Sequence, residues 1–444
     1  MPTIFSVITG NINASVILLR ISGKESLVCL KKLGVNKSLE PRKSSYSQIF
    51  DPLDNSLLDD CLITYFKAPH SFTGDDVVEI AIHGSNYILK RLTEILLSIN
   101  NVRLAQAGEF SKIAFLNNKF DLTAAEGILD LINSQSKAQH DQALKQAQGK
   151  LGKIYDNWRE KIIKILAHLE AVIDFPDEDL PQNLIDQINL QVNALKAQVK
   201  NHLNDNKCGQ KLRDGLLIAI IGAPNVGKST LMNYLAKDDV AIVSKQAGTT
   251  RDVIEIDLDL AGLPVRIADT AGIRDTKDDI EKQGIQRAVK KSAQADFRII
   301  VFDSQNLSEG SNDKALDIKD DDLIILNKTD LQRPQIPKFL QACQNQVIEI
   351  SLVKKINLDV LLDVITNKCQ KILSVTDAPM ITRARYRVVL EDFLVNLEEF
   401  SFDKEIEICA EILRICCQNI GQITGKIDVD ELLDVIFNDF CIGK

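Results

Sequence analysis

One segment of the chain has the residue types and the spacing of a phosphate-binding loop. The run Gly222-Ala-Pro-Asn-Val-Gly227-Lys228-Ser229 matches G-x-x-x-x-G-K-[ST], and it follows an apolar run and precedes a helical pattern. The amides of such a loop surround phosphate oxygens, the lysine reaches the β- and γ-phosphates, and the serine hydroxyl binds Mg²⁺. A plain glycine turn is the alternative, and the strand–loop–helix context favours the phosphate-binding interpretation.

Three further segments indicate which nucleotide binds. Asn327-Lys328-Thr329-Asp330 ends another apolar run, and its carboxylate can accept from N1–H and the exocyclic amine of guanine, a donor pair that adenine lacks. Asp269-Thr270-Ala271-Gly272 offers a carboxylate for Mg²⁺ and a glycine amide for the γ-phosphate. Thr249-Thr250-Arg251 lies where a threonine would complete the Mg²⁺ shell. The order and spacing of these motifs predict a GTP site.

Hydrolysis also needs a group that positions water. Ile273 follows Gly272 where Ras-like enzymes carry a glutamine, and a hydrophobic side chain cannot orient water. Either hydrolysis is slow or another group acts, such as Glu281, for which a solvated carboxylate at a helix start is the alternative. Asn225 offers a side-chain carbonyl near the phosphates, and a monovalent cation bound there would take the place of an arginine finger.

The elements that position these motifs alternate between strands and helices from Gly215 to about Gln370. Buried parallel strands are expected at Leu216–Ile221, Phe297–Phe302, Leu323–Leu326 and Val347–Ile350. Val253–Leu260 and Val265–Ala268, joined by Ala-Gly-Leu-Pro, predict an antiparallel hairpin. We therefore expect a Ras-like P-loop α/β domain whose parallel sheet has one antiparallel strand.

The flanking segments have different patterns. Residues 1–117 read as mixed α/β, with strands at Ser15–Ile21 and Val77–Ile82, whereas 121–208 are helical and include an amphipathic helix at Ile154–Ala171. Helical sequence returns after Asp377, so the α/β domain is expected to be inserted into one discontinuous helical domain. The expected divisions are an N-terminal domain at 1–117, the first helical part at 118–211, the nucleotide domain at 212–376 and the second helical part at 377–444.

Composition limits the class of protein. The 444 residues are 45% hydrophobic and 26% charged, as in ordinary globular chains of roughly three domains. No apolar run reaches the roughly 18 residues of a membrane span, and the N-terminus lacks a basic signal-peptide region. The net charge of −9 excludes binding of nucleic acid by bulk charge, so RNA would need a local patch or a partner. The nine cysteines include no C-x-x-C pair, which favours buried thiols in a reducing cytosol.

Several segments outside the nucleotide motifs resemble one protein family. They are YFKAPHSFTGD at 65–75, GEFS at 108–111, FLNNKFDL at 115–122, HLEAVIDFPDE at 168–178 and FCIGK at 440–444. Over essentially its full length the chain is similar to the MnmE (TrmE) family of tRNA-modification GTPases. It departs from the family pattern at 11–15, 106–107 and 351–353.

The resemblance implies a specific activity. Its N-terminal domain would dimerise and bind 5-formyl- or 5,10-methylene-tetrahydrofolate. The homodimer would form a heterotetramer with an FAD-containing MnmG-type protein and add a carboxymethylaminomethyl-type group to C5 of the wobble uridine of certain tRNAs. K⁺-dependent pairing of the G domains would activate GTP hydrolysis. The protein would be cytoplasmic and would have no membrane partner.

The resemblance also assigns residues. Folate contacts fall on Arg20, Glu79, Lys119 and Lys444, K⁺ ligands on Asn225, Ser244, Gln246 and Thr249, and Mg²⁺ ligands on Ser229 and Thr250. Glu281 becomes the water-orienting acid, and Cys441 becomes a candidate for one-carbon transfer. The remaining nucleotide- and ion-binding positions are Val226, Gly227, Lys228, Thr230, Lys245, Ala247, Gly248, Asp269, Thr270, Ala271, Gly272, Asn327, Lys328 and Asp330.

Alternatives remain at this stage. A surface ion pair between Arg20 and Glu79 and a structural role for Cys441 are the plainer interpretations of those residues. Arg383, Arg385 and Arg387 could contact phosphate or form ion pairs. For the whole chain, the alternatives are a ribosome-assembly GTPase of the Era or Der type and a nucleotide-regulated scaffold that does no chemistry itself.

Overall fold

The computed structural model describes most of the chain. Described are residues 1–10, 14–174, 182–237, 255–269, 293–305, 318–331, 347–374 and 378–427, with the single positions 336, 340, 436, 437, 440 and 443. These residues form two compact units, one of 1–129, 146–191 and 395–444 and the other of 130–145 and 192–394. Among the helices described here, none is long and apolar enough to cross a membrane.

The first unit begins with a six-stranded sheet of order β3-β4-β5-β2-β1-β6. Its strands are β1 (Thr3–Val7), β2 (Val16–Ser22), β3 (Ser44–Phe50), β4 (Leu57–Phe66), β5 (Val77–His83) and β6 (Val102–Leu104). Helices α1 (Ser26–Lys32) and α2 (Asn86–Leu97) share one hydrophobic core with the sheet. Alternate residues of β2 point into that core, which explains the period-two pattern of its sequence. The two strands that the sequence predicts here are confirmed within one residue.

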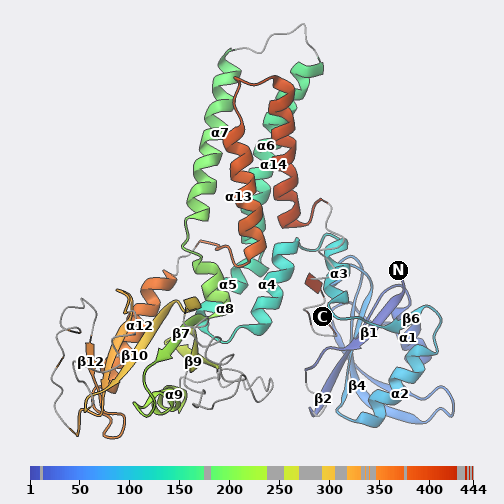
Figure 1. The fold of residues 1–444 in the computed structure, drawn as a ribbon. Helices are drawn as coiled ribbons and strands as arrows, with labels where there is room; N and C mark the ends of the chain where they lie inside the picture. The colour runs from blue at the N-terminus through green and yellow to red at the C-terminus, as the bar shows by residue number, and fades with distance from the viewer. Residues whose placement is uncertain are drawn as a thin grey trace, which may run out of the picture. The chain divides into compact units, whose positions relative to one another are not determined.

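The helices after this sheet are α3 (Glu109–Leu116), α4 (Leu122–Asn133), α5 (Lys137–Ala147), α6 (Lys150–Asp174), α7 (Gln182–Leu203) and α8 (Cys208–Asp214), and near the end α13 (Ala384–Glu399) and α14 (Ile406–Thr424). Helix α14 packs along α6, although more than 200 residues separate them in the sequence (Figure 1). Arg414 of α14 binds Glu170, and Lys426 Nζ lies 2.6 Å from Asp156 Oδ1. The two helical flanks therefore pack together, as the sequence predicts.

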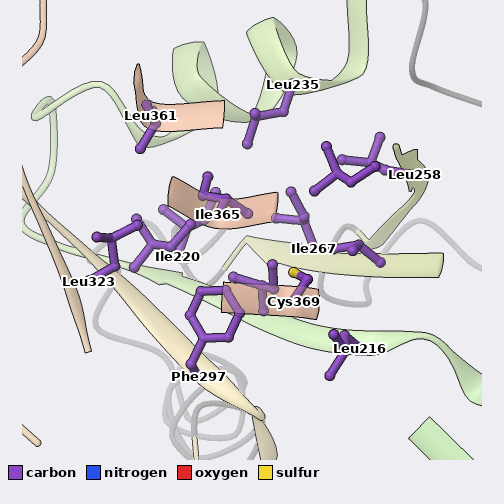
Figure 2. Packing of buried hydrophobic residues seen from close by; sticks show 14 of the residues in the cluster. Leu216, Ile220, Leu235, Leu258, Ile267, Phe297, Leu323, Leu361, Ile365 and Cys369 are labelled. Carbon is purple, nitrogen blue, oxygen red and sulfur yellow. The ribbon is translucent and has the colours of Figure 1, made fainter. Parts of the chain in front are cut away.

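The second unit contains a sheet of order β12-β11-β10-β7-β9-β8, in which only β8 is antiparallel to its neighbour. Its strands are β7 (Leu216–Ile221), β8 (Glu255–Leu260), β9 (Leu263–Asp269), β10 (Phe297–Asp303), β11 (Leu323–Asn327) and β12 (Val347–Glu349), with helices α9 (Lys228–Lys237) and α12 (Leu358–Leu373). Figure 2 shows Leu361, Ile365 and Cys369 of α12 packed with residues of the sheet. The inserted parallel α/β domain is confirmed.

The β8–β9 connection is shorter than predicted. Leu263 and Pro264 belong to β9, so Ala261 and Gly262 form a two-residue turn, with φ of +52° and +86°. Positive φ at both central residues is the requirement of a type I′ turn, which fits the twist of paired strands. The sequence Ala-Gly-Leu-Pro suggested a longer loop because proline is uncommon inside strands.

The seven described cysteines are buried and unpaired: Cys29, Cys61, Cys208, Cys369, Cys409, Cys416 and Cys417. Burial raises the pKa of the Cys29, Cys61, Cys369 and Cys416 thiols to about 12. These thiols are therefore protonated and inert at neutral pH. The prediction of buried thiols holds for this described set, and Cys343 and Cys441 lie outside it.

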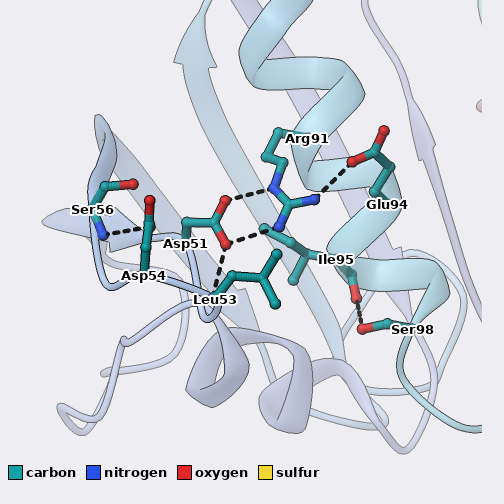
Figure 3. Close-up of polar contacts among 8 residues, drawn as sticks. All are labelled: Asp51, Leu53, Asp54, Ser56, Arg91, Glu94, Ile95 and Ser98. Atoms are coloured by element: carbon teal, nitrogen blue, oxygen red, sulfur yellow. Dashed lines mark hydrogen bonds and ion pairs between the residues drawn. The ribbon is translucent and has the colours of Figure 1, made fainter.

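An ion-pair cluster ties α2 to the loop after β3. Arg91 donates from Nε to Asp51 Oδ2 (2.5 Å), from Nη2 to Asp51 Oδ1 (3.0 Å) and from Nη1 to Glu94 Oε2 (2.7 Å), as Figure 3 shows. These bonds lower the pKa of Asp51, with the hydrogen bond from Arg91 as the largest cause. A lowered pKa means that the pair stabilises the fold above the ordinary carboxyl pKa of about 4 and loses its effect as the pH falls.

We predict that Arg91→Met lowers the Tm of the protein by a few degrees at pH 7. The difference from the wild type should shrink as the pH falls through the lowered pKa of Asp51, because a protonated carboxyl no longer forms the ion pair. Glu94→Gln is the control, since it removes only the more exposed contact. A difference in Tm that persists unchanged in acid would contradict this account.

Candidate nucleotide-binding site

The nucleotide motifs meet at one edge of the second sheet. The phosphate-binding loop follows β7, Asp269 ends β9, Asp303 ends β10 and Asn327 ends β11. These strands are parallel, and the register pairs Asp303 with Asn327 and Ile220 with Asp269. Ligands of doubly wound α/β domains bind outside the carboxyl ends of the strands. The topology therefore brings the sequence-predicted motifs together.

Glycine is required at two positions of the loop. A Cβ on Gly222 would lie 2.3 Å from the carbonyl oxygen of Val301 in β10. A Cβ on Gly227, whose φ is +107°, would lie 2.3 Å from Asn327 Nδ2. The loop thus passes so close to two neighbouring segments that any side chain would displace them. Steric contact with neighbouring segments therefore explains why both positions of the motif are glycine.

Lys228 places its charge over the loop. Its ammonium donates to the carbonyl oxygens of Gly222 (2.6 Å) and Ala223 (2.7 Å), and the residue is only 6% exposed. Lys228 is also the first residue of α9, so the partial positive charge of the helix N-terminus adds to that of the ammonium. Phosphate oxygens are the ligands that such a loop and helix start bind best.

The predicted guanine motif is anchored to the loop through Asn327. Its Nδ2 donates to the carbonyl oxygen of Val226 (2.8 Å), and its Oδ1 accepts from the amide of Leu352 (3.3 Å). Thr329 Oγ1 donates to the carbonyl oxygen of Ile350 (2.9 Å). Asp330 follows in a half-buried position. Phosphate loop, guanine motif and the segment after β12 therefore form one hydrogen-bonded unit.

Sequence reasoning missed two members of this unit. The first is Asp303, whose Oδ2 accepts from Lys328 Nζ at 2.7 Å. A lone carboxylate at the end of an apolar strand was the sequence signal that could have identified this residue. Leu352 belongs to the segment in which the chain departs from the family pattern. Its contribution is a backbone N–H, which almost any side chain could accompany, so the departure leaves this bond intact.

The structure places some predicted residues and leaves others outside its described part. Asn225 lies in the loop with φ of +64° and is exposed, as are Ser229 and Thr230 in the first turn of α9. For Asp269 only its place at the end of β9 is described. Outside the described residues lie Ser244, Lys245, Gln246, Ala247, Gly248, Thr249, Thr250, Thr270, Ala271, Gly272, Ile273, Glu281, Cys441 and Lys444.

The residues that the resemblance assigns to folate lie in the first unit. Arg20 and Glu79 face each other across β2 and β5, and Arg20 Nη2 is 2.8 Å from Glu79 Oε1. The Arg20 guanidinium also lies over the rings of Phe72 (5.1 Å) and Phe110 (5.6 Å). The ion pair considered from the sequence is therefore present, in a partly buried aromatic setting. Lys119 Nζ donates to the carbonyl oxygen of Pro69 at 2.8 Å.

The C-terminal segment packs onto the same unit. Phe437 and Phe440 share a hydrophobic cluster with Leu122 of α4, and their ring centroids are 5.4 Å apart. A Cβ on Gly443 would lie 2.2 Å from the carbonyl oxygen of Val7 in β1. Strand β1 is the direct neighbour of β2, which carries Arg20. Gly443 is therefore only one strand away from the Arg20–Glu79 pair.

The arginines after the α/β domain form ion pairs. Arg383 Nη2 lies 2.6 Å from Asp130 Oδ1, and Arg387 binds Asp205. Arg385 lies over the ring of Tyr386, with 4.5 Å between the guanidinium carbon and the ring centroid. The sequence left open whether these arginines contact phosphate or form ion pairs, and Arg383 and Arg387 form ion pairs.

Comparisons with known proteins cover nearly the whole chain. The family model of the GTP-binding protein TrmE N-terminus matches residues 3–119, and that of the MnmE helical domain matches residues 122–441. Proteins called tRNA modification GTPase MnmE from Rickettsia typhi and Rickettsia canadensis are each 45% identical to the chain, over 447 and 446 residues. Each alignment covers 100% of both chains.

The solved structures resemble smaller parts of this chain. Era bound to MgGDPNP and a segment of 16S ribosomal RNA is 26% identical, covering 34% of this chain and 56% of that one, with a TM-score of 0.27. The G domain of the T. maritima iron transporter FeoB is 25% identical, covering 35% and 99%, with a TM-score of 0.28. The matches that extend over the flanking segments decide the assignment: the chain belongs to the MnmE family of tRNA modification GTPases.

Proposed function

We propose that this chain hydrolyses GTP to drive a modification of the wobble uridine of certain tRNAs. The observation that carries the GTP part is the Asn327 bridge, which fixes the Asp330 segment to the phosphate loop. A carboxylate held there selects guanine, and Lys228 with the Ser229 hydroxyl suits a Mg²⁺-bound triphosphate. We propose K⁺ as a further cofactor, bound by Asn225, Ser244, Gln246 and Thr249, with hydrolysis activated by pairing of two G domains.

The proposed modification uses the first unit. A reduced folate carries a planar ring system and carboxylates, and the Arg20 guanidinium beside two aromatic rings and the Lys119 ammonium suit both features. We propose 5-formyl- or 5,10-methylene-tetrahydrofolate as the donor, bound by Arg20, Glu79, Lys119 and Lys444. The position of Gly443 beside β1 supports a role for the C-terminal residues, including Cys441, at this site.

The proposed partners follow from the family. The chain would act as a homodimer in a heterotetramer with an FAD-containing MnmG-type protein, which together add the carboxymethylaminomethyl-type group to C5 of uridine in tRNA. A net charge of −9 supports the need for a partner or a local patch in tRNA binding. Buried, reduced thiols support a cytoplasmic location.

The modification is tested by mass spectrometry of tRNA nucleosides. Cells that lack this chain should lose the carboxymethylaminomethyl-type wobble nucleoside, and expression of the wild-type chain should restore it. The variant Arg20→Gln, which removes the cation facing the proposed folate, should restore much less. An unchanged nucleoside profile in the deleted strain would refute the proposed modification while leaving GTP hydrolysis open to separate measurement.

The cation dependence is tested by steady-state GTP turnover. Turnover should be higher in K⁺ than in Na⁺ at equal ionic strength, because Na⁺ is too small for a site sized for K⁺. Asn225→Ala should remove the difference, since the side-chain carbonyl is the proposed ligand. Thr230→Ser, which keeps a hydroxyl in the first turn of α9, is the control. Equal turnover in both salts would rule out the K⁺ assignment.

Glu281 is tested by comparing kcat with nucleotide affinity. Glu281→Ala should lower kcat by about 10²–10⁴-fold, the usual loss when a water-positioning base is removed. The Kd for GTP should change little, because the residue need not contact the phosphates before reaction. Asp279→Ala, which removes a carboxylate two residues earlier in the chain, is the control and should keep the wild-type kcat. Wild-type turnover by the Glu281 variant would indicate that Glu281 is a solvated carboxylate with no part in hydrolysis.

A further inference from the structure

The nucleotide edge of the second sheet carries a partly buried ion pair between Asp303 and Lys328. Asp303 is the last residue of β10, and Lys328 directly follows Asn327, the last residue of β11. Lys328 Nζ donates to Asp303 Oδ2 at 2.7 Å, and the Lys328 and Asp303 side chains are 30% and 9% exposed. The second carboxylate oxygen, Oδ1, accepts from the amide of Gln305 at 3.1 Å. Both oxygens of Asp303 therefore accept from protein donors, as expected of a carboxylate that fixes its neighbours.

The two strands are joined at this edge without the ion pair. The parallel register of β10 and β11 already pairs Asp303 with Asn327. Just beyond that pair, Ser304 N donates to the carbonyl oxygen of Asn327 at 2.9 Å. A side-chain ion pair adds little to strands that their backbones already hold together. The effect of the pair on Lys328 therefore explains it better than an effect on the sheet.

The backbone of Lys328 is fixed in a conformation that lysine seldom adopts. Its φ is +65°, in the left-handed region. Its carbonyl oxygen accepts from the amide of Leu331 at 3.0 Å, and the amide of Thr329 donates to the carbonyl oxygen of Ile350 at 3.2 Å. Such conformations persist where the surrounding contacts impose them, and they concentrate at binding sites. The backbone end of the Lys328 side chain is therefore held by the turn that leads to Asp330.

The other end of the Lys328 side chain is held by Asp303. A lysine side chain samples many rotamers, and a ligand that packs against it must first order it. Because the Asp303 carboxylate binds the ammonium, the methylene groups of Lys328 lie between two fixed points. Lysine methylenes form an apolar surface, and an ordered surface binds a ligand at a smaller loss of entropy. The ion pair therefore prepares Lys328 for a ligand with an apolar face.

A guanine base suits this surface and its neighbours. Asn327 joins the segment to the phosphate loop through the Val226 carbonyl, and Asp330 follows shortly after Lys328 in the sequence. A carboxylate at Asp330 would bind the hydrogen-bonding edge of guanine, which leaves the apolar faces of the ring to be covered by other groups. The methylene groups of Lys328 lie in the same segment as this carboxylate and can supply that cover.

The ion pair also separates the tasks of two lysines. Lys228 places its ammonium over the phosphate loop, where it donates to the carbonyl oxygens of Gly222 and Ala223. A second lysine ammonium without a partner would also be attracted to a di- or triphosphate. The Asp303 carboxylate binds the ammonium of Lys328 instead. Lys228 is therefore available to the phosphates, and Lys328 to the base.

We propose that Asp303 is a positioning residue for guanine nucleotides. It binds the Lys328 ammonium and thereby holds the Lys328 side chain beside the Asp330 segment before the nucleotide arrives. Asp303 itself contacts neither the base nor the phosphates. The inference rests on the proposed function, because it needs guanine to bind at Asp330.

The proposal is tested by the Kd of GDP for the full-length protein. Asp303→Asn keeps the size of the side chain and removes its charge, so the Lys328 ammonium loses its ionic partner. The Kd should rise about tenfold, the usual effect of weakening one hydrogen bond to a charged group. In steady-state GTP turnover, the loss in kcat/KM should lie in KM rather than in kcat, because Asp303 does not act on the reacting phosphate. A wild-type Kd for Asp303→Asn would overturn the proposal.

A double-variant cycle separates positioning from a structural role. Lys328→Met keeps an unbranched apolar side chain and removes the ammonium, and it should also raise the Kd of GDP. Adding Asp303→Asn to Lys328→Met should raise the Kd no further, because Asp303 acts only through that ammonium. A further tenfold rise in the double variant would overturn the proposal. Should Asp303→Asn fail to fold, Lys328→Met decides the question, since an unchanged Kd in that variant would equally overturn it.

The control breaks a comparable ion pair at the opposite ends of the same two strands. Arg298 Nε of β10 donates to Asp322 Oδ1, directly before β11, at 2.8 Å, and both side chains are largely buried. Arg298→Met should lower the Tm and leave the Kd of GDP unchanged, because nucleotides bind at the carboxyl ends of the strands. An equal rise in Kd for Arg298→Met and Asp303→Asn would assign both effects to the sheet and overturn the positioning role. A wild-type chain that binds GDP no more tightly than ADP would instead contradict the proposed function, and the inference with it.

Discussion

The bridge made by the Asn327 side chain is the interaction on which the nucleotide site depends. Its amide nitrogen binds the Val226 carbonyl in the phosphate loop, and its amide oxygen binds the Leu352 amide after β12. Asn327 is only 3% exposed, so water does not compete for its two hydrogen bonds. Gly227 must lack a Cβ to let Asn327 approach. The phosphate loop and the predicted guanine motif are therefore joined through one buried side chain.

Much of this arrangement could be predicted from the sequence because it rests on side-chain identity at short spacing. The glycines, Lys228 and Asn327 are each required for a local steric or electrostatic reason, and apolar runs predict the strands that carry them. The packing of the two helical flanks against each other could also be predicted, because both have the amphipathic pattern of helices that bury one face. An ion pair between Arg20 and Glu79 was only one of two interpretations, since a pairing across β2 and β5 leaves no short-range signal in the sequence.

The features that the sequence did not predict are backbone contacts between distant segments. The Leu352 amide on Asn327 and the Gly262 carbonyl on Ala138 both involve groups that every residue carries, so no residue type signals them. The two-residue turn at Ala261 and Gly262 was missed for a related reason. Alanine seldom adopts positive φ, and proline seldom lies within a strand, yet the pairing of β8 with β9 imposes both.

The insertion of the G domain constrains how its two ends must pack. An inserted domain leaves and rejoins its host at two points, which must lie close together. Here Cys208 of α8, before the G domain, donates from Sγ to the carbonyl oxygen of Ile372 in α12, after it, at 3.3 Å. Leu212, Ile365 and Leu373 belong to the same core, so this junction is firmly packed. Further bonds lie beside this junction: the Gly262 carbonyl accepts from the Ala138 amide of α5 at 3.0 Å, and Arg213 Nε of α8 lies 3.2 Å from Asp130 Oδ1 of α4. The entry segment of the G domain is therefore held both to its exit helix and to the helices that precede it in the chain.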